Sequence, residues 1–106
     1  MARPTERGEV WLAQMDKLRP VVIASRNDLN GVRARATVAM VTTTVRGIPS
    51  EVALDHRDGF PKACVINCDD LATIDKARLR ERRGSLSTAR IAEFDEALRF
   101  ALAVTQ

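Results

Sequence analysis

The sequence predicts a mainly β (α+β) fold: a small, strongly bent antiparallel sheet or barrel with one helix at its C-terminal end. Short apolar or alternating segments follow one another closely, separated by clusters of Gly, Pro, Asn and Asp. From Ser87 onward the pattern changes to the three-and-four spacing of an amphipathic helix. A chain of 106 residues has the usual size of one domain, so we expect a single domain over 1–106.

The first two strands are expected on either side of a short loop. Residues 8–13 alternate, which places Val10 and Leu12 in the core and Trp11 on the opposite face. That tryptophan suits either a partner surface or a second layer of core. The second strand is expected over about 20–25, where three β-branched residues in a row favour a buried position.

Arg19 begins this second strand in an extended conformation, because the ring of Pro20 crowds the amide and Cβ of the residue before it. The first residue of a strand is one of the few places where a sheet tolerates the missing N–H of proline. We expect the guanidinium head to be free at the rim, where its planar fork suits a phosphate. The alternative is an ordinary surface arginine, which the dipeptide alone favours.

The third strand is expected over 37–42, and its nearly unbroken apolar character predicts a central position in the sheet. It ends in three threonines, of which Thr42 shares a face with Val38 and Met40. Hydroxyl groups at this strand end suit a phosphate oxygen held beside an arginine. Threonine is also simply a good strand former, which is the alternative explanation.

Further short elements complete the sheet. Strands are expected at 50–55 and 64–67, turns at 27–31 and 46–49, and a loop at 56–61. The arginine-rich stretch 79–86 suits either a track for phosphate groups or an edge strand protected by charge, and we favour the edge strand.

The C-terminal helix is predicted from Ser87, which suits an N-cap. One apolar stripe follows the helical spacing and contains Ile91, Phe94, Leu98, Ala101 and Leu102. We expect this stripe to pack on the mouth of the barrel or at a dimer interface.

Composition narrows the class of protein. Hydrophobic residues make up 45% and charged residues 29% of the chain, as in ordinary soluble domains. No apolar run approaches membrane length, so we expect no signal peptide, no membrane contact and a cytoplasmic location. The net charge of +3 is mild for a non-specific nucleic-acid binder. An aromatic content of 4% argues against a plain single-strand binder that stacks bases.

Metal-ligating side chains are scarce. Cys64 and Cys68 are the only cysteines, and His56 is the only histidine. This set does not make a convincing zinc site, so we expect no metal, no cofactor and two reduced thiols. A mechanism that needs two histidines from one chain is excluded, which leaves Arg, Lys, Asp, Glu, Ser or Thr for any catalysis.

Several collinear segments together resemble the MazF/PemK family of toxin endoribonucleases. The matching segments are 7–11, 19–22, 41–43, 48–52 and 65–79, followed by the helix at 88–103. Their order and spacing fit from about residue 6 to 104. Each segment is weak alone, but the collinear set is fairly specific.

The resemblance implies an SH3-like antiparallel barrel with added helices (CcdB/MazF-like) that works as a homodimer. It implies a toxin that cleaves RNA (mRNA, tRNA or rRNA) at short sequence motifs without a metal ion and so inhibits growth. The expected products carry 2′,3′-cyclic phosphate and 5′-hydroxyl ends. A cognate antitoxin is the implied protein partner, often with an acidic, flexible segment that folds onto the RNA groove.

The resemblance also implies the residues of the site. The catalytic arginine of the family's Arg-Pro motif falls on Arg19, and its catalytic threonine falls on Thr42. Positions that contact RNA just after the fifth strand fall on Asp69 and Asp70, and we add Thr43 beside the catalytic threonine.

The chain departs from the family at two places. The usual Gly-Ser-Glu-Gln-Gly loop between the first two strands is reduced to 14–18. Some members use a glutamate from that loop, and Asp16 is the nearest carboxylate, so the candidates for the general base are Asp16 and water. Asp70 stands where glutamine is common. An acid there accepts hydrogen bonds from base amino groups but repels phosphate, so the base preference should differ.

Two other functions remain open from the sequence. A gyrase-directed toxin of the CcdB type shares the architecture and would leave RNA intact. A non-catalytic SH3-like RNA-binding module would bind RNA with a steep salt dependence and would produce no new ends.

Overall fold

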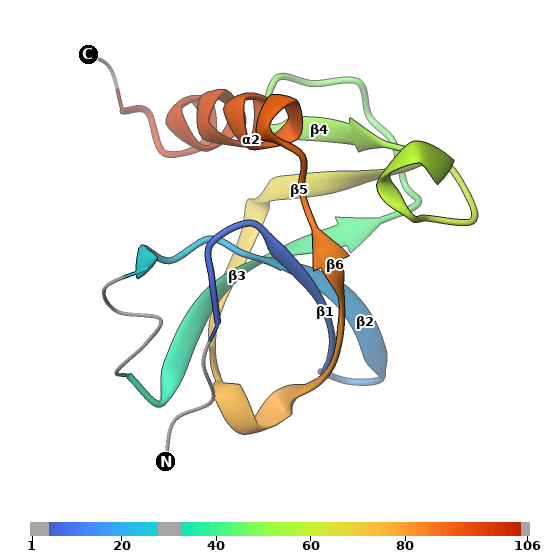
Figure 1. Cartoon of the computed structure of the whole chain (residues 1–106). Helices are drawn as coiled ribbons and strands as arrows, with labels where there is room; N and C mark the ends of the chain where they lie inside the picture. Colours follow the sequence, from blue (N-terminus) through green and yellow to red (C-terminus); the bar gives the residue numbers. More distant parts are fainter. Residues whose placement is uncertain (1–4, 28–32, 105–106) are drawn as a thin grey trace.

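One antiparallel sheet of six strands, with an α-helix across one end, makes up the described part of the chain (Figure 1). The computed structural model describes residues 5–27 and 33–104. The elements are β1 (Glu9–Gln14), β2 (Leu18–Ile23), β3 (Arg35–Thr42), β4 (Glu51–Leu54), η1 (His56–Asp58), β5 (Cys64–Asp75), η2 (Lys76–Arg78), β6 (Leu79–Ser85) and α2 (Thr88–Ala101). The prediction of a mainly β fold with a C-terminal helix is confirmed.

The strand order is β4-β5-β3-β2-β1-β6, and every neighbouring pair is antiparallel. The sheet curls strongly, so that β6 and β1 stand opposite β3 and β5 around a barrel-like interior (Figure 1). The third strand is central, as its apolar run predicts. The arginine-rich stretch forms β6 at one edge of the sheet, which is the interpretation that we favoured.

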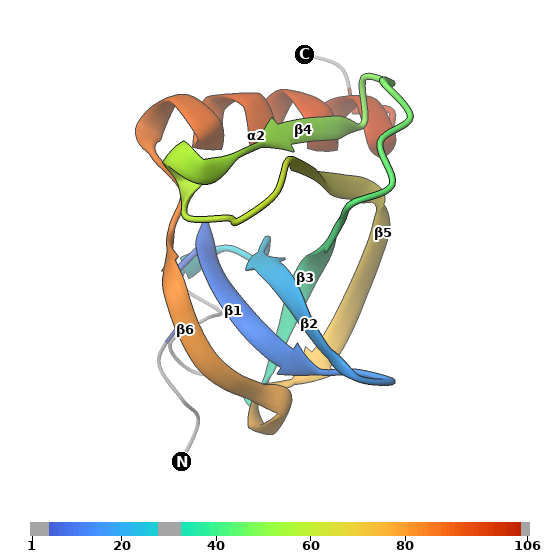
Figure 2. The ribbon, with the colours of Figure 1, turned by 90° about the vertical axis from the view of Figure 1, so that its right-hand side faces the viewer.

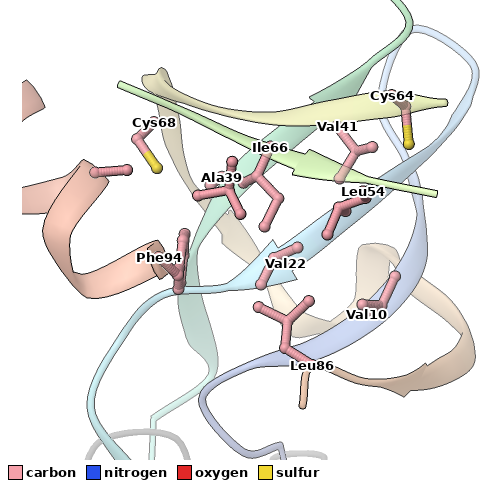
Figure 3. Close-up of a cluster of buried hydrophobic side chains, with 12 residues drawn as sticks. Val10, Val22, Ala39, Val41, Leu54, Cys64, Ile66, Cys68, Leu86 and Phe94 are labelled. Carbon is pink, nitrogen blue, oxygen red and sulfur yellow. The ribbon is translucent and has the colours of Figure 1, made fainter. Parts of the chain in front are cut away.

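Two clusters of buried side chains use opposite faces of the curled sheet. The helix core, shown in Figure 3, lies between α2 and the sheet and contains Val10, Val22, Ala39, Ile66 and Phe94. The barrel core contains Trp11, Ala13, Val21, Ile23, Val38 and Leu79. Trp11 is only 7% exposed, so it belongs to a second layer of core. Leu12, which we expected in the core, is only half-buried and belongs to neither cluster.

β5 is longer than predicted. We expected a strand at 64–67 only, but β5 covers twelve residues. Its ladder with β3 shifts register where Ala39 pairs with Leu71 and Met40 pairs with Asn67, so the residues 68–70 bulge out of the strand. Two aspartates in this bulge interrupt the apolar pattern and conceal the continuation of the strand. β5 bends sharply along its length (Figure 2).

The helix begins and packs as predicted. The Oγ of Ser87 accepts a hydrogen bond from the Arg90 amide at 3.2 Å, and Phe94 is fully buried. The prediction was wrong for Leu102, which is 58% exposed. The helix ends one residue earlier, and Ala103 adopts a positive φ of 56°, which turns the chain away from the stripe.

Three smaller points complete the comparison with the sequence. The loop predicted at 56–61 contains the short helix η1. The turn predicted at 27–31 lies, apart from Asn27, outside the described residues. No helix in the described part of the chain is long and apolar enough to cross a membrane.

Candidate functional site

β2 and β3 separate at the residues that the sequence singled out. Their ladder ends at the pair Val21–Met40. The same register continued would place Arg19 opposite Thr42, two steps beyond this last pair. Both residues therefore lie where the sheet opens, at equal distance from the end of the ladder.

The two strands diverge because each keeps its other neighbour. Arg19 still pairs with Ala13 of β1, and Thr42 still pairs with Val65 of β5. Pro20 stands at the first step beyond the ladder and has no N–H to donate. A proline at this point suits the end of pairing between β2 and β3.

A cavity of about 520 Å³, called cavity A below, opens at this divergence. Its lining residues are Met15, Asp16, Arg19, Met40, Val41, Thr42, Thr44, Arg46, Asn67, Asp70 and Ala72. The structure thus brings together four of the predicted site residues, namely Arg19, Thr42, Asp16 and Asp70. The two others, Thr43 and Asp69, do not line this cavity.

A second cavity of about 320 Å³, called cavity B below, adjoins cavity A. Its lining residues are Lys17, Leu18, Arg19, Pro20, Val41, Thr42, Thr43, Phe60, Pro61, Lys62 and Cys64. Arg19, Val41 and Thr42 line both cavities and form the wall between them. Thr43 is exposed and belongs to cavity B alone.

The head of Arg19 is paired, in contrast to the free head that we expected. Its Nε donates to Oδ1 of Asp16 at 2.7 Å, and its Nη2 donates to Oδ2 at 2.9 Å. This pairing holds the pKa of Asp16 well below its usual range. It also raises the pKa of Arg19, with a further contribution from the charge of Asp70. The two residues of this pair lie three positions apart, on either side of a tight loop.

Arg19 keeps donors for a ligand in spite of this pair. Asp16 occupies one edge of the guanidinium, and Nη1 makes no hydrogen bond to any residue that the structure describes. The side chain is 37% exposed and lines both cavities. Asp16 therefore fixes the plane of the guanidinium and leaves a second pair of N–H groups for an anion.

The hydroxyl of Thr42 is oriented by its own strand end. Its Oγ1 accepts a hydrogen bond from the Thr44 amide at 3.1 Å. No acceptor for its hydroxyl hydrogen occurs within 5–27 and 33–104. Thr42 is half-buried. Its hydroxyl is held by a backbone contact and is available as a neutral donor.

The two adjacent aspartates of the β5 bulge have different surroundings. Asp69 accepts a hydrogen bond of 2.6 Å from the Oγ of Ser50, which is fully buried. The amide of Asp69 donates to Oδ1 of Asn67 at 3.0 Å, and the amide of Cys68 donates to the Ser50 carbonyl at 2.9 Å. These contacts anchor the bulge on its Asp69 side. Asp70 has none of them and lines cavity A.

Sequence reasoning missed Arg46, a further cation of cavity A. The carboxylate of Glu51 accepts hydrogen bonds from the amides of Arg46 and Gly47 at 2.9–3.2 Å and so shapes the loop after β3. The guanidinium of Arg46 makes no ion pair with any described residue. In the sequence, Arg46 is a single basic residue four positions after Thr42, and no motif marks it. Asn67 and Thr44 were also missed, because only the bulge and the loop bring them to the cavity.

No group of three or more His, Cys, Asp and Glu side chains suited to a metal ion occurs in the described ranges. Burial raises the pKa of the Cys68 thiol to about 11. Burial also raises the pKa of Cys64, the cysteine that lines cavity B. Both thiols are therefore protonated at neutral pH and are poor nucleophiles.

Comparison with known proteins gives consistent matches over nearly the whole chain. Residues 6–102 match the model of the family described as PemK-like, MazF-like toxin of type II toxin-antitoxin system. Probable endoribonuclease MazF5 of Mycobacterium tuberculosis is 38% identical over 99 residues, covering 91% of each chain. Endoribonuclease EndoA of Bacillus subtilis is 30% identical over 110 residues, covering 93% of this chain and 95% of the relative.

Solved structures agree with these matches. The Mycobacterium tuberculosis toxin MazF-mt6 superposes with a TM-score of 0.87 at 34% identity, covering 92% of this chain and 99% of the toxin. A mycobacterial endoribonuclease in complex with its cognate antitoxin superposes with a TM-score of 0.88 at 28% identity, covering 96% and 98%. The MazF-like fold expected from the sequence is therefore confirmed, and the chain belongs to the PemK-like, MazF-like family of toxins of type II toxin-antitoxin systems.

Proposed function

We propose that this protein is the toxin of a type II toxin-antitoxin pair and that it is an endoribonuclease. The observation that carries the proposal is that Arg19 and Thr42, from different strands, line one cavity at the end of the β2–β3 ladder. Relatives named as endoribonucleases over nearly the full length support the same activity. A guanidinium and a hydroxyl at one site suit the stabilisation of a phosphoryl group.

The proposed reaction is an internal transesterification of RNA. The ribose 2′-oxygen attacks the adjacent phosphorus and gives up its proton, and the 5′-oxygen leaves and takes up a proton from water. The products carry a 2′,3′-cyclic phosphate and a 5′-hydroxyl. Negative charge grows on the non-bridging phosphoryl oxygens, where preorganised donors are most effective. In this proposal the free edge of Arg19 binds these oxygens, Thr42 donates one further hydrogen bond, and neither role needs a metal ion.

Asp16 has a positioning role in this proposal. Both of its oxygens accept hydrogen bonds from Arg19, and its pKa lies well below the usual range, so it is a weak proton acceptor. We therefore assign the proton of the 2′-hydroxyl to water, the other candidate that the sequence left open. Asp16 holds the plane of Arg19, which keeps the charged head aligned with the phosphate.

Base recognition is proposed for the part of cavity A away from the phosphate. Asp70 and Asn67 line it, and an aspartate accepts hydrogen bonds from the exocyclic amino groups of bases. Asp69 serves this site indirectly, since its contacts with Ser50 and Asn67 fix the bulge that carries Asp70. Thr43 is proposed as an RNA contact in cavity B.

The proposed partners follow from the same site. RNA (mRNA, tRNA or rRNA) is the substrate, a cognate antitoxin is the inhibitor, and the toxin works as a homodimer in the cytoplasm. Complex formation with an antitoxin is described for a mycobacterial relative. Arg46, Lys17 and Lys62 lack ionic partners among the residues that the structure describes, and they would pair with an acidic antitoxin segment.

The test is the mapping of new RNA ends. Purified protein is incubated with total RNA in the presence of EDTA, and 5′-hydroxyl ends are captured and sequenced. We expect wild type to cut at a short motif, and we expect Arg19→Ala and Thr42→Ala each to lose on the order of a hundredfold or more in rate. Arg80→Ala, at an exposed position on the far edge strand β6, is the charge-matched control. Intact RNA after incubation with wild type would refute the proposal and favour a gyrase-directed toxin.

A further inference from the structure

We infer that cavity B is a second RNA subsite, which holds the nucleotide on the side of the cleaved phosphate away from Asp70 by charge and stacking, without reading its base. This inference rests on the proposed function. The shared wall carries it: Arg19 and Thr42, the residues proposed to hold the phosphate, line cavity B as well as cavity A. A phosphate bound at this wall places its two flanking nucleotides toward the two cavities.

The two cavities differ in charge: the charges that line cavity A balance, whereas cavity B is positive. Cavity A contains two carboxylates, Asp16 and Asp70, beside two arginines. Cavity B contains no carboxylate, and Lys17 and Lys62 line it together with Arg19. The ammonium group of neither lysine makes a hydrogen bond or ion pair with any residue in the described part of the chain. Two unpaired ammonium groups beside a phosphate-binding arginine suit the next phosphate of an RNA strand.

The apolar lining of cavity B suits the face of a base. Phe60, Pro20 and Pro61 contribute to this lining, and Phe60 is partly buried and packs against the helix core. A ring fixed in this way offers a stacking surface that tolerates every base, because every base has a π-face. The volume of about 320 Å³ lies at the lower end of the range for small-ligand pockets and suits one nucleotide.

The segment that carries Phe60 is held firmly. Arg90 of α2 donates to Asp58 of η1 at 3.1 Å, and both side chains are at least four-fifths buried. Asp58 and Asp55 cap η1 reciprocally, and Gly59 ends it with a φ of 91°. In Figure 2 the segment after η1, drawn in yellow-green, passes between the helix and the upper ends of β1 and β2. The subsite is therefore built on a fixed segment rather than on a loose loop.

Cavity B lacks the carboxylate and amide groups that cavity A offers to bases. Its lining contains no carboxylate and no side-chain amide, whereas cavity A has Asp70 and Asn67. We therefore expect variants of cavity B to weaken binding of all RNA sequences alike. Variants of Asp70 should instead change which sequences are cut.

The experiment measures binding separately from cleavage. The probe is a fluorescent ten-nucleotide RNA with 2′-O-methyl riboses, which cannot be cleaved because the attacking hydroxyl is blocked. Its Kd is measured by anisotropy at several salt concentrations. We expect Lys17→Ala and Lys62→Ala each to raise Kd about three- to tenfold at low salt and to reduce the salt slope by about 0.7. Phe60→Leu should raise Kd about fivefold or more and leave the slope unchanged.

Matched controls come from outside both cavities. Arg80→Ala removes an exposed cation from β6, and Phe100→Leu shortens an aromatic side chain that is 60% exposed on α2. Neither should change Kd. A thermal melt of each variant confirms the fold, and the two lysine variants change only exposed side chains.

The outcomes separate this inference from the proposed function. If wild type cleaves RNA and Arg19→Ala abolishes cleavage, while the three cavity B variants keep wild-type Kd and KM, the subsite is refuted and the proposed function stands. If the cavity B variants change the cleavage motif, the claim of base-independent binding is refuted. If wild type cuts no RNA, both proposals fall.

Discussion

Arg19 and Thr42 each lie two register steps beyond Val21–Met40, the last residue pair of β2 and β3. Each residue is still held by a strand on its other side, through Ala13 and Val65 respectively. The sheet, rather than a loop, therefore sets the distance between the guanidinium and the hydroxyl. Sites built on strands keep their geometry better than sites built on loops, which suits a phosphate that two donors must hold together.

Pro20 is expected to keep β2 and β3 apart beyond their last residue pair. Pro20→Ala restores a backbone N–H and removes the constraint on Arg19, so the ladder can extend toward Val41. We expect the cleavage rate to fall about tenfold, the cost of a small misplacement of Arg19, while the free energy of unfolding changes by about 1 kcal/mol or less. Pro49→Ala, in the exposed turn before β4, is the control. A variant that cuts as fast as wild type would show that the proline does not set the geometry.

Asp16 is expected to act on the rate through Arg19. Asp16→Ala leaves the guanidinium without its oriented acceptor, so we expect kcat to fall about tenfold with a smaller change in KM. Asp16→Glu, which keeps a carboxylate within reach, should recover part of the loss. Steady-state kinetics on a short RNA substrate measure both constants. A variant with only KM changed would contradict the positioning role.

The pH dependence provides an independent test of Asp16. Its pKa is lowered in the folded protein, below the unfolded value of about 3.9, by the hydrogen bonds from Arg19. The stabilisation from this pair is therefore complete above that unfolded value and is lost as pH falls toward the folded pKa. Asp16 therefore stays ionised between about pH 5 and about pH 9. We expect the kcat profiles of wild type and Asp16→Asn to be parallel there. A slope that disappears in the variant would indicate a general base.

The part of the site that the sequence predicts comes from local rules. The constraint of Pro20 on Arg19 and the polar end of an apolar strand at Thr42 are both visible within a few residues. The helix from Ser87 was visible for the same reason. Arg19 and Thr42 line the same cavity because β2 pairs with β3. In the sequence, the family resemblance was the argument for placing the two residues in one site.

The remaining features depend on contacts between distant segments. Phe60 and Lys62 reach cavity B because Arg90, about thirty residues later, fixes η1. The bulge of β5 separates Asp69 from Asp70 because Ser50 holds one of them. Trp11 is buried because a strongly curled sheet encloses side chains on both of its faces. The hydrophobic periodicity of a single segment does not reveal such contacts.

Arg7 is expected to stabilise the packing of α2. Its Nη1 lies 2.7 Å from Oδ1 of Asp95, its Nε donates to the Ala24 carbonyl at 3.0 Å, and its guanidinium carbon lies 5.2 Å from the centre of the Phe94 ring. Because the side chain is partly exposed, we expect Arg7→Met to lower the free energy of unfolding by about 1–2 kcal/mol. Urea unfolding measures the change. Arg99→Met, which removes an exposed pair with Glu96, should cost less than about 0.5 kcal/mol, and equal losses in the two variants would contradict the special role of Arg7.

The two adjacent aspartates of the β5 bulge are expected to have different roles, one in the stability of the fold and the other in the choice of base in the cleavage motif. Asp69→Ala leaves the buried hydroxyl of Ser50 without its acceptor, so it should cost about 1–3 kcal/mol in urea unfolding. Asp70→Ala changes an exposed side chain without such a contact, so stability should change by about 0.5 kcal/mol or less. It should instead relax the preference for one base in the cleavage motif by roughly tenfold.

Mapping of 5′ ends and urea unfolding on the same two variants make this comparison. Ser50→Ala is the control for the first aspartate, because it removes the other half of the same hydrogen bond. It should lower stability without altering the preferred base, since Asp70 still lines cavity A. If Asp69→Ala relaxes the motif at unchanged stability, the base-reading carboxylate is Asp69. The bulge would then present its first aspartate, rather than its second, to the RNA.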